Sequence, residues 1–237
     1  MARVPEDFTE AEYRELVRLA SGHYRFARFH EEHDPPCALW RHDLDFSVQR
    51  ALALARIEAE EGARATYFLD LNSGFYNALE QANVDAMRSI LELGHDLGLH
   101  FDPTFGGVDD QLAESRDLLE HTFGVQVRAF SVHNPELVAW ADERDAIAGM
   151  VNVYGRAVRE RFSYVSDSNG IWRHRRLRDV LEAATEQRLH VLTHPAWWVP
   201  EPLAPRARIQ RCIDGRARAT ALAYDDLLER SGRPNVA

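Results

Sequence analysis

The sequence predicts an α/β fold with a parallel sheet and crossover helices, either open and doubly wound or closed as a barrel. Strand and helix signals alternate about seven times along the chain. Polar residues also follow the end of almost every apolar run. Finally, 237 residues lie within the range that one hydrophobic core can organise. We therefore expect a single domain over residues 1–237.

The segment before the first core strand is predicted to be a helical extension over residues 1–36. A helix is expected from about Glu10 to Ala20. The polar stretch after it ends in Pro35 and Pro36, which stop any regular element. The core is then expected over residues 37–200, followed by a C-terminal helical segment over residues 201–237.

Seven apolar runs have the short length and the composition of β-strands. Together they would supply the strands of the parallel sheet. They are Cys37–Arg41, Ala65–Leu69, Leu97–His100, Val125–Val132, Met150–Tyr154, Phe162–Val165 and Leu189–Thr193.

Helical periodicity fills most of the gaps between these runs. Leu177, Val180, Leu181 and Ala184 follow the i, i+3, i+4, i+7 pattern of one helix face. Other one-sided apolar sets are Val48, Leu52, Ala55 and Ala59, and Leu112, Leu119 and Phe123, while Gly62, Gly94 and Gly124 stand where helices would end.

Composition excludes several classes of function. All 28 basic residues are arginine, so a lysine Schiff base, a pyridoxal-phosphate lysine and a Walker A lysine are impossible. Cys37 and Cys212 are too few for a thiolate metal cluster and are expected to be inert thiols. The net charge of −10 disfavours nucleic acid and anionic lipid as partners. We expect a small-molecule or glycan substrate instead.

Targeting signals are not expected in this sequence. The longest apolar runs are shorter than the ~20 residues of a membrane span. Residues 1–7 carry acids where a secretory signal would begin with basic residues. We therefore expect a cytoplasmic protein.

The reactive residues fall at the carboxyl ends of the predicted strands. In parallel α/β folds these ends lie at one edge, so residues far apart in sequence would converge there. The ends are Arg41–Asp45, Asp70, His100–Asp102, Ser131–Asn134, Ser166–Asn169 and Thr193–His194.

Asp43 and Asp45 are the first candidates for catalysis. Strand alternation points both in the same direction as Arg41. One carboxylate could bind a metal while the other acts as a base, and the oxygen and imidazole supply suits a hard or borderline divalent ion. The alternative is structural, because Asp45 or Ser47 could cap the next helix. We favour the catalytic interpretation.

Histidines end three of the later strands. His100, His133 and His194 are each placed for a role as metal ligand, general acid or oxyanion donor. His95 begins its strand instead and is expected to be structural. Trp197 could stack on a sugar ring or could cover the end of the barrel.

With these residues in place, the chain resembles the polysaccharide deacetylase family, the NodB-homology domain of carbohydrate esterase family four. Residues 41–45 (RHDLD) resemble its first motif, residues 65–69 (ATYFL) its second strand, and residues 94–100 (GHDLGLH) its metal-histidine strand. Residues 192–194 (LTH) resemble its final motif, and the likeness covers about residues 37–200 in the right order.

The resemblance implies a distorted seven-stranded β/α barrel that uses a bound divalent metal to remove acetyl groups from sugars. Zinc is the first candidate for this metal. Carried over by position, it makes Asp43 the general base and His194 the general acid. Asp45 and His100 become metal ligands. A metal-bound water with a pKa of about 7 would attack the amide carbonyl.

Several positions depart from the family pattern. The second metal histidine is replaced by Thr104, so the third ligand must be His133 or Asp102, of which we favour His133. The arginine of the third motif is missing from residues 131–135, and Arg41 is a candidate substitute. The fourth motif is echoed only in Asp167 and Trp172. The chain resembles a divergent member.

We therefore expect a metal-dependent hydrolase that deacetylates an N-acetylated sugar or a polysaccharide precursor, which could be linked to a nucleotide or a lipid. Arg41, Asp102, Asp167 and Trp197 are the expected substrate-binding residues. Two alternatives are a non-catalytic carbohydrate-binding pseudoenzyme and an amidohydrolase of a non-sugar amide.

Overall fold

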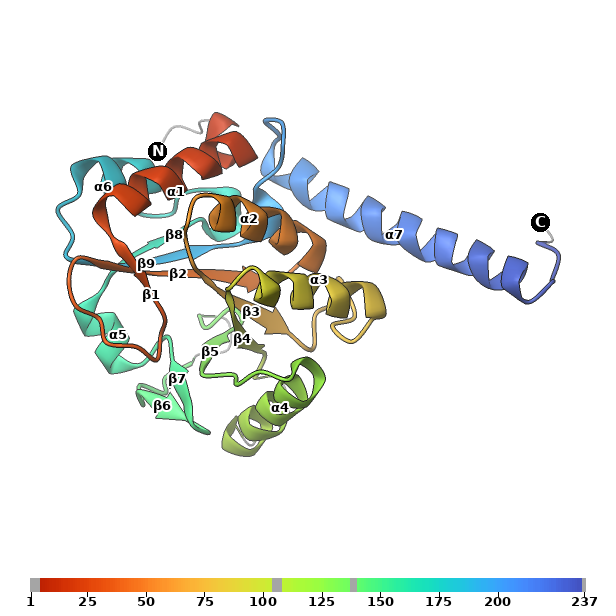
Figure 1. The fold of residues 1–237 in the computed structure, drawn as a ribbon, viewed down its shortest axis with the longest axis horizontal. Coiled ribbons are helices and arrows are strands. Elements are labelled where there is room, and N and C mark those ends of the chain that lie inside the picture. Colours follow the sequence, from red (N-terminus) through yellow and green to blue (C-terminus); the bar gives the residue numbers. More distant parts are fainter. Residues whose placement is uncertain (1–4, 104–107, 137–139, 236–237) are drawn as a thin grey trace.

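The central element is one curled, mainly parallel sheet, which confirms the predicted fold class (Figure 1). The computed structural model describes residues 5–103, 108–136 and 140–235. The strands run in the order β6-β7-β5-β4-β3-β2-β9-β8, with β1 paired to β2. Their bounds are β1 Arg25–Ala27, β2 Cys37–Leu44, β3 Thr66–Asp70, β4 Asp96–Phe101, β5 Ala129–Val132, β6 Ala146–Ile147, β7 Met150–Asn152, β8 Ser163–Ser166 and β9 Arg188–Thr193.

Helices pack on the outer face of this sheet and bury the main hydrophobic core against it. In the described part of the chain, no helix combines the length and the apolar character that a membrane crossing requires. The α-helices are α1 Glu10–His23, α2 Val48–Glu60, α3 Gln81–Glu92, α4 Val108–Phe123, α5 Arg156–Arg161, α6 Leu177–Ala183 and α7 Pro205–Arg230, and short 3-10 turns cover Pro5–Phe8 (η1), Ser168–Gly170 (η2) and Pro195–Trp197 (η3).

The strand count differs slightly from the seven expected. Each expected strand overlaps an observed one, and β1 and β6 are additional. The two additions are short, and β1 lies in the extension that was expected to be helical, where it pairs in parallel with the start of β2. The sheet ends at β6 and β8, and no ladder joins these ends in the described residues. The barrel is therefore distorted and open, with a gap between β6 and β8.

Arg41 of β2 points into the interior of this half-barrel. It is fully buried, and one guanidinium nitrogen donates to Tyr154, which follows β7, at 2.8 Å. The guanidinium also lies 4.9 Å from the centroid of the Tyr154 ring and 5.6 Å from that of Phe68. A Cβ on Gly98 would come within 2.5 Å of the Phe68 ring. Glycine at this position thus leaves room for Phe68 beneath Arg41.

The next residue of β2, His42, points to the outer face, where a second polar cluster is buried under α1 and α2. Its Nε2 lies 2.7 Å from Oε1 of Glu58 and its Nδ1 lies 2.7 Å from Oγ1 of Thr193. Tyr13 and Tyr67 also donate to Glu58, the latter at 2.6 Å. The carboxylate therefore keeps three donors although it is fully buried.

His95 borders this cluster and fills the structural role expected for it. Its Nδ1 accepts from the backbone N–H of Ala65 at 3.2 Å, and its Nε2 lies 3.0 Å from the carbonyl oxygen of Ala55. Both ring nitrogens are thus used to join neighbouring backbone segments. The hydrogen bonds assign the proton to Nε2.

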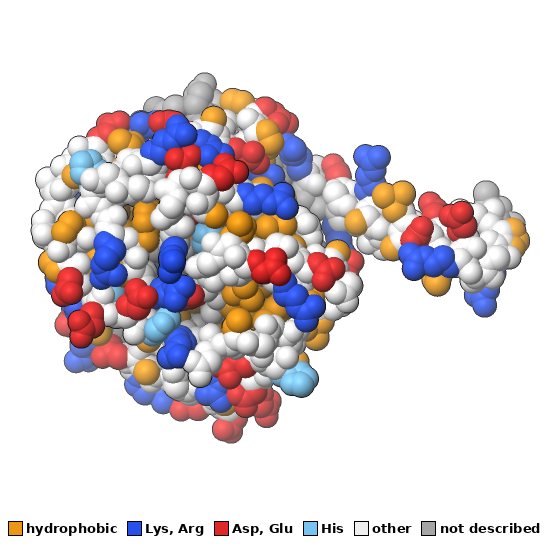
Figure 2. Space-filling model, in the orientation of Figure 1, with side chains coloured by type: hydrophobic (Ala, Val, Ile, Leu, Met, Phe, Trp, Pro, Cys, Tyr) orange, Lys and Arg blue, Asp and Glu red, His pale blue; other side chains and the backbone are white. Residues whose placement is uncertain are grey.

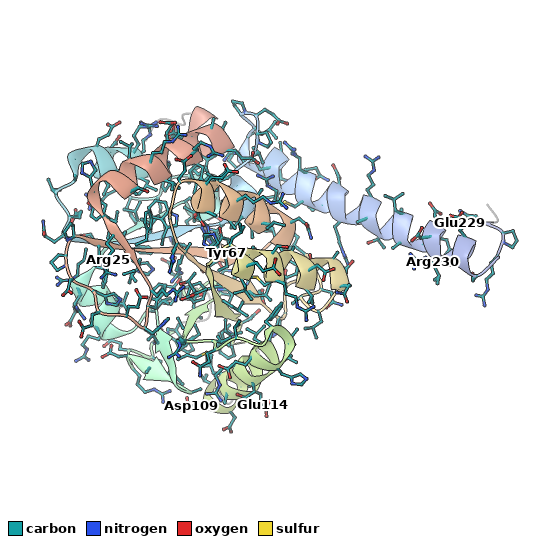
Figure 3. The ribbon with its side chains drawn as sticks, viewed as in Figure 1. Arg25, Tyr67, Asp109, Glu114, Glu229 and Arg230 are labelled. Carbon is teal, nitrogen blue, oxygen red and sulfur yellow. The ribbon has the colours of Figure 1, made fainter. Side chains whose placement is uncertain are left out.

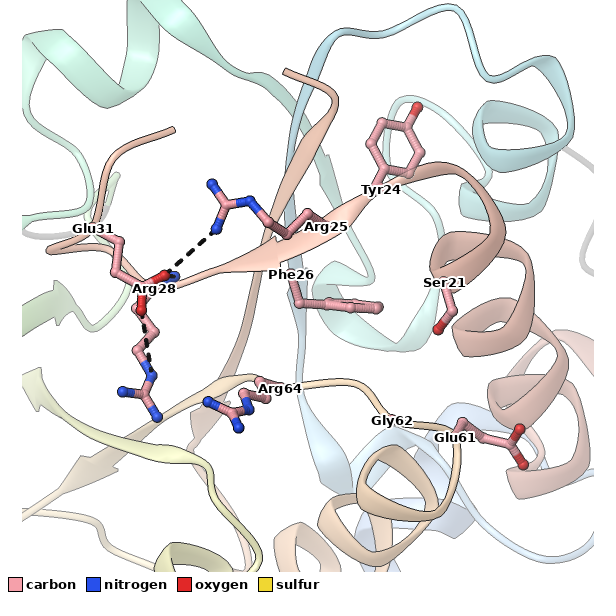
Figure 4. A pocket seen from close by; sticks show the side chains of 9 residues that line it. All are labelled: Ser21, Tyr24, Arg25, Phe26, Arg28, Glu31, Glu61, Gly62 and Arg64. Atoms are coloured by element: carbon pink, nitrogen blue, oxygen red, sulfur yellow. Dashed lines mark hydrogen bonds and ion pairs between the residues drawn. The ribbon is translucent and has the colours of Figure 1, made fainter. Parts of the chain in front are cut away.

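A pocket of about 430 Å³ lies at the other end of the barrel, near the start of β1 and the loop that follows α2 (Figure 4). Glu31 lies between Arg25 and Arg28 there, 3.7 and 4.0 Å from their nitrogens. Arg28 also pairs with Asp96 at 3.1 Å. These arginines are already paired with acids, and the pocket is far from the carboxyl ends of the strands.

The last helix, α7, stands apart from the body. Figures 1 and 2 show it as an arm, and Figure 3 places Glu229 and Arg230 at its far end. Only the start of α7 is anchored, where the buried Arg208 lies 4.6 Å from the Phe8 ring centroid. Every residue from Ala217 to Arg230 except Leu228 is exposed.

Candidate active site

Three of the predicted metal ligands meet at the carboxyl edge of the sheet. Asp45 follows β2, His100 lies in β4, and His133 follows β5. One ligand atom from each of these residues lies within 4.8 Å of those of the other two. Asp45 Oδ1 and His100 Nε2 are 3.2 Å apart. The strands thus bring together side chains that are separated by up to 88 positions in the sequence.

A chain of hydrogen bonds sets the orientation of the His100 ring. Ser131 donates to Asp43 Oδ1 at 3.3 Å, so its oxygen is left to accept from His100 Nδ1, which lies 2.7 Å away. Arg41 donates to the other oxygen of Asp43 at 2.9 Å. The network therefore places a proton on His100 Nδ1. Its Nε2 faces Asp45, and the charges of Asp43 and Asp45 outweigh burial and raise the pKa of the imidazole.

These residues fit a divalent metal. Asp45 Oδ1 and His100 Nε2 are buried, lie 3.2 Å from each other and have no other hydrogen-bond partner among the described residues. A proton on Nε2 would satisfy both atoms, and a bound cation could take the place of that proton. One carboxylate and two imidazoles also suit zinc and similar ions. The second bond of His100, to Ser131, is the outer contact that metal-binding histidines generally have.

His194 lies on the opposite side of Asp45. Its Nδ1 is 2.6 Å from Oδ1 of the fully buried Asp167, and its Nε2 is 3.8 Å from Asp45 Oδ2. Trp198 donates to the second oxygen of Asp167 at 2.9 Å. Because an ionised carboxylate only accepts, His194 Nδ1 carries a proton and Nε2 faces the site.

Charged neighbours shift the pKa values of Asp45 and His194 in the direction opposite to the shift that burial causes. Burial raises the pKa of Asp45, but the nearby imidazoles of His194 and His100 outweigh it and lower that pKa to about 2. Burial lowers the pKa of His194, but Asp45 and Asp167 outweigh it and raise that pKa to about 9. His194 is therefore an imidazolium near neutral pH, and Asp45 is a carboxylate.

Asp43 and Arg41 lie behind the three candidate ligands. Asp43 is 2% exposed, and both of its oxygens accept hydrogen bonds. Burial lowers the pKa of Arg41, but Asp43 outweighs it and the pKa is raised. Among the described residues, Arg41 donates hydrogen bonds to Asp43 and Tyr154, and it does not line the cleft at the carboxyl edge. Arg41 was considered both as a substrate-binding residue and as a support for the base Asp43, and its position fits the second role.

Asp102 was the alternative to His133 as third ligand. It lies outside the group of three, and its Oδ2 is 3.9 Å from His133 Nδ1. His133 Nε2 is 2.8 Å from the side-chain nitrogen of Asn134. Thr104, the position of the missing family histidine, lies outside the described residues.

An open cleft of about 320 Å³ leads to these residues. Asp45, His133 and His194 line it, and so do Asp70 and Asp102. Its aromatic wall is formed by Phe46, Phe75 and Trp197, with Phe46 ring centroids 4.7 Å from Phe75 and 5.5 Å from Trp197. The wall is apolar and the floor is charged.

Sequence reasoning missed two residues that position the site. Ser131 fixes His100, and Trp198 fixes Asp167. Ser131 was visible only as part of a strand end, and nothing about a serine there distinguishes it. The Trp197–Trp198 pair carried a usable signal, since neighbouring residues point in different directions and one of the two had to be buried.

Two of the solved structures that are similar to this chain are a pseudoenzyme mutant and a deacetylase, whereas no protein-family profile and no curated protein matches it. One is a mutant of a CE4 family pseudoenzyme with restored enzymatic activity, with 15% identity and a TM-score of 0.44, and the match covers 80% of this chain and 65% of that one. This chain thus spans less than two thirds of that protein.

The other is the Streptococcus pyogenes deacetylase PplD in complex with acetate, with 13% identity and a TM-score of 0.43, and the match covers 89% of this chain and 92% of that one.

Proposed function

We propose that this protein is a metal-dependent hydrolase that deacetylates an N-acetylated sugar or a polysaccharide precursor. One observation carries the proposal. Asp45, His100 and His133 each place one ligand atom within 4.8 Å of those of the other two, while His194 Nε2 faces the second oxygen of Asp45 at 3.8 Å.

Asp45, His100 and His133 would hold the metal, with zinc first among the candidates. When bound, such an ion polarises a carbonyl and acidifies water. Ser131 and Asp43 would keep the His100 lone pair directed at the ion, since His100 Nδ1 is 2.7 Å from Ser131. Removal of such an outer partner typically weakens metal affinity by about 10- to 100-fold.

Asp43 and His194 would transfer the protons. Asp43 would accept the proton of the attacking water, and Arg41, which donates to it at 2.9 Å, would hold its carboxyl group in place. His194 Nε2 carries the proton that a departing amine requires, and its imidazolium can donate to the developing oxyanion. Asp167 would hold the ring of His194 in this orientation, as its 2.6 Å contact with Nδ1 suggests.

The cleft supports a sugar as the substrate. Phe75, which is 41% exposed, offers an aromatic face on which a sugar ring can stack, while Asp102 and Asp70 offer acceptors for hydroxyl groups. Trp197 is only 7% exposed and would serve as part of the wall. A volume of about 320 Å³ fits a single sugar unit better than a long chain. Linkage of that sugar to a nucleotide or a lipid stays a prediction from the sequence.

The test combines metal content with product release. Elemental mass spectrometry of the protein purified without added metal or chelator should find about one ion per chain, and Asp45→Ala should lose it. His133→Ala should also lose the ion, whereas Asp102→Ala, its matched control, should retain it. Zinc-loaded protein should release acetate from at least one member of a panel of N-acetylated sugars and sugar nucleotides.

Three outcomes would redirect the proposal. Sugar binding without metal would favour the pseudoenzyme. Metal binding with activity only on non-sugar amides would favour the second alternative. A retained ion in both His133→Ala and Asp102→Ala would show that our set of ligands is wrong.

A further inference from the structure

The two nitrogens of the His133 ring have different surroundings. Nε2 lies 2.8 Å from the side-chain nitrogen of Asn134. Nδ1 lies 3.9 Å from Oδ2 of Asp102, which is too long for a hydrogen bond. Among the described residues, Nδ1 makes no hydrogen bond. One nitrogen of this candidate ligand is therefore engaged, and the other can bind a cation.

His100, the neighbouring candidate ligand, shows the same division of its ring with the two nitrogens exchanged. Its Nδ1 lies 2.7 Å from Ser131 Oγ, and its Nε2 faces Asp45 at 3.2 Å. The centroids of the two imidazole rings are 5.2 Å apart. Metal-binding histidines generally bind the ion through one nitrogen and hold an outer partner with the other. Asn134 stands to His133 as Ser131 stands to His100.

The backbone places Asn134 next to His133. Asn134 has a φ of 45°, in the left-handed region that asparagine adopts more readily than most residues. Pro135 follows it and disfavours the right-handed helical conformation at Asn134. The backbone N–H of His133 donates to the carbonyl oxygen of Phe101 at 2.8 Å, which ties this turn to the end of β4. The amide thus starts from a constrained backbone position beside the ring.

We infer that Asn134 is a positioning residue, whose amide is the outer partner of His133 Nε2 and directs His133 Nδ1 at the metal. The inference rests on the metal site of the proposed function. An asparagine amide can present its nitrogen or, after a half turn, its oxygen. As the two side chains stand, the amide nitrogen faces Nε2, so Nε2 accepts and the proton of the neutral ring is on Nδ1.

Metal binding through Nδ1 requires the other tautomer of His133. The Nδ1 proton leaves to solvent and Nε2 takes up a proton from solvent, so the ring stays neutral. The amide of Asn134 then turns so that its oxygen accepts from Nε2–H. Such an acceptor fixes the orientation of the ring and makes the ligand nitrogen more basic. Without it, the ring can rotate and holds the ion less tightly.

Asn169 provides a matched control for Asn134. It also has a left-handed backbone, with a φ of 57°, and it lines the same cleft. In the described part of the chain, no hydrogen bond joins its side chain to Asp45, His100 or His133. Asn169→Ala therefore removes an amide from the cleft, at a similar backbone conformation, without removing a partner of a candidate ligand.

The test is the zinc affinity of the full-length protein, measured by competition with a chelator. Asn134→Ala should weaken zinc binding by about 10- to 100-fold, because the outer partner is lost. Asn134→Asp should bind zinc at least as tightly as wild type, since a carboxylate accepts from Nε2–H more strongly than an amide does. Asn169→Ala should stay within about twofold of wild type. Thermal unfolding of the zinc-free proteins checks that each variant is folded.

The nitrogen that binds the ion is identified separately. Long-range proton–nitrogen NMR of the zinc-loaded protein should show a proton on His133 Nε2, with the signals of this ring assigned by their absence in His133→Ala.

Each contrary result has a distinct meaning. Tighter zinc binding in Asn134→Ala would show that the amide competes with the metal for Nε2, and unchanged binding would show that it has no part in the site. Either result, a proton on Nδ1 in the zinc-loaded protein, or equal losses in Asn134→Asp and Asn134→Ala would overturn this inference and leave the proposed function standing. A wild type that binds no zinc would instead overturn the metal site itself, and this inference with it.

Discussion

The two faces of β2 carry buried polar clusters of opposite character. On the outer face, Glu58 accepts from His42, Tyr13 and Tyr67. On the inner face, the cluster around Asp43 leaves His100 Nε2 with no partner except Asp45. Burial is almost equal on the two sides, so burial alone does not identify a site. A carboxylate whose donors are all internal is typical of structure, whereas ligand-type atoms gathered beside an open cleft favour a binding site.

The largest expected effect is the loss of kcat in His194→Gln, a substitution on the side of the candidate active site. This change removes the proposed acid but leaves the fold intact, because His194 lies at the edge of the cleft. We expect kcat to fall by about 10²- to 10⁴-fold. Steady-state acetate release measures the loss, and thermal unfolding checks stability. Unchanged kcat would exclude His194 as the acid.

On the outer face, Glu58→Gln should affect stability. The amide cannot accept from all three donors, and one of them is left buried without a partner. We expect the free energy of unfolding to fall by about 3–5 kcal/mol. Urea unfolding measures it, with Glu60→Gln on the exposed side of α2 as the control. A loss below about 1 kcal/mol would contradict the structural role of this cluster.

The expected effect of Ser131→Ala lies between the loss of activity in His194→Gln and the loss of stability in Glu58→Gln. The change removes the acceptor of His100 Nδ1, so the ring can turn or change tautomer. We expect zinc affinity to fall by about 10- to 100-fold, and the free energy of unfolding to fall by about 1–3 kcal/mol because the buried donor loses its acceptor. Competition with a chelator measures the affinity. If Ser131→Ala binds zinc as wild type does, the hydrogen-bond chain does not direct His100.

The smallest effect concerns His190, which lies in the interior with Arg41. Burial and the charge of Arg41 keep its pKa well below 6.5. The unfolded chain therefore binds a proton below pH ~6.5 that the folded chain does not, so His190 makes the protein less stable as pH falls below that value. The slope should be at most ~1.4 kcal/mol per pH unit, and His190→Leu should remove it. Thermal unfolding between pH 5 and pH 8 measures both.

The strand ends were the predictable part of the site. Strand alternation placed Asp43 with Arg41, and the 2.9 Å contact between them agrees. The parallel topology brought His100 and His133 to one edge. Both inferences use only the period of a strand and the direction of a sheet.

The outer cluster could not be predicted in the same way. Glu58 lies on α2, a helix whose sequence suggests nothing unusual, and it is buried only because His42 and two tyrosines meet it from other elements. Likewise, β1 is three residues long and forms only because the start of β2 offers a free edge. Such features depend on contacts distant in sequence, which periodicity does not report.

Phe68, which packs over Gly98 next to Arg41, limits the routes by which substrate and products can move. The fully buried ring fills the interior of the half-barrel beside Arg41, at the strand position that pairs with Asp43. A substrate would therefore enter, and both products of its hydrolysis would leave, by the same mouth. Residues at that mouth would then determine the order in which the two products leave. They would also determine how strongly a bound product inhibits the binding of the next substrate.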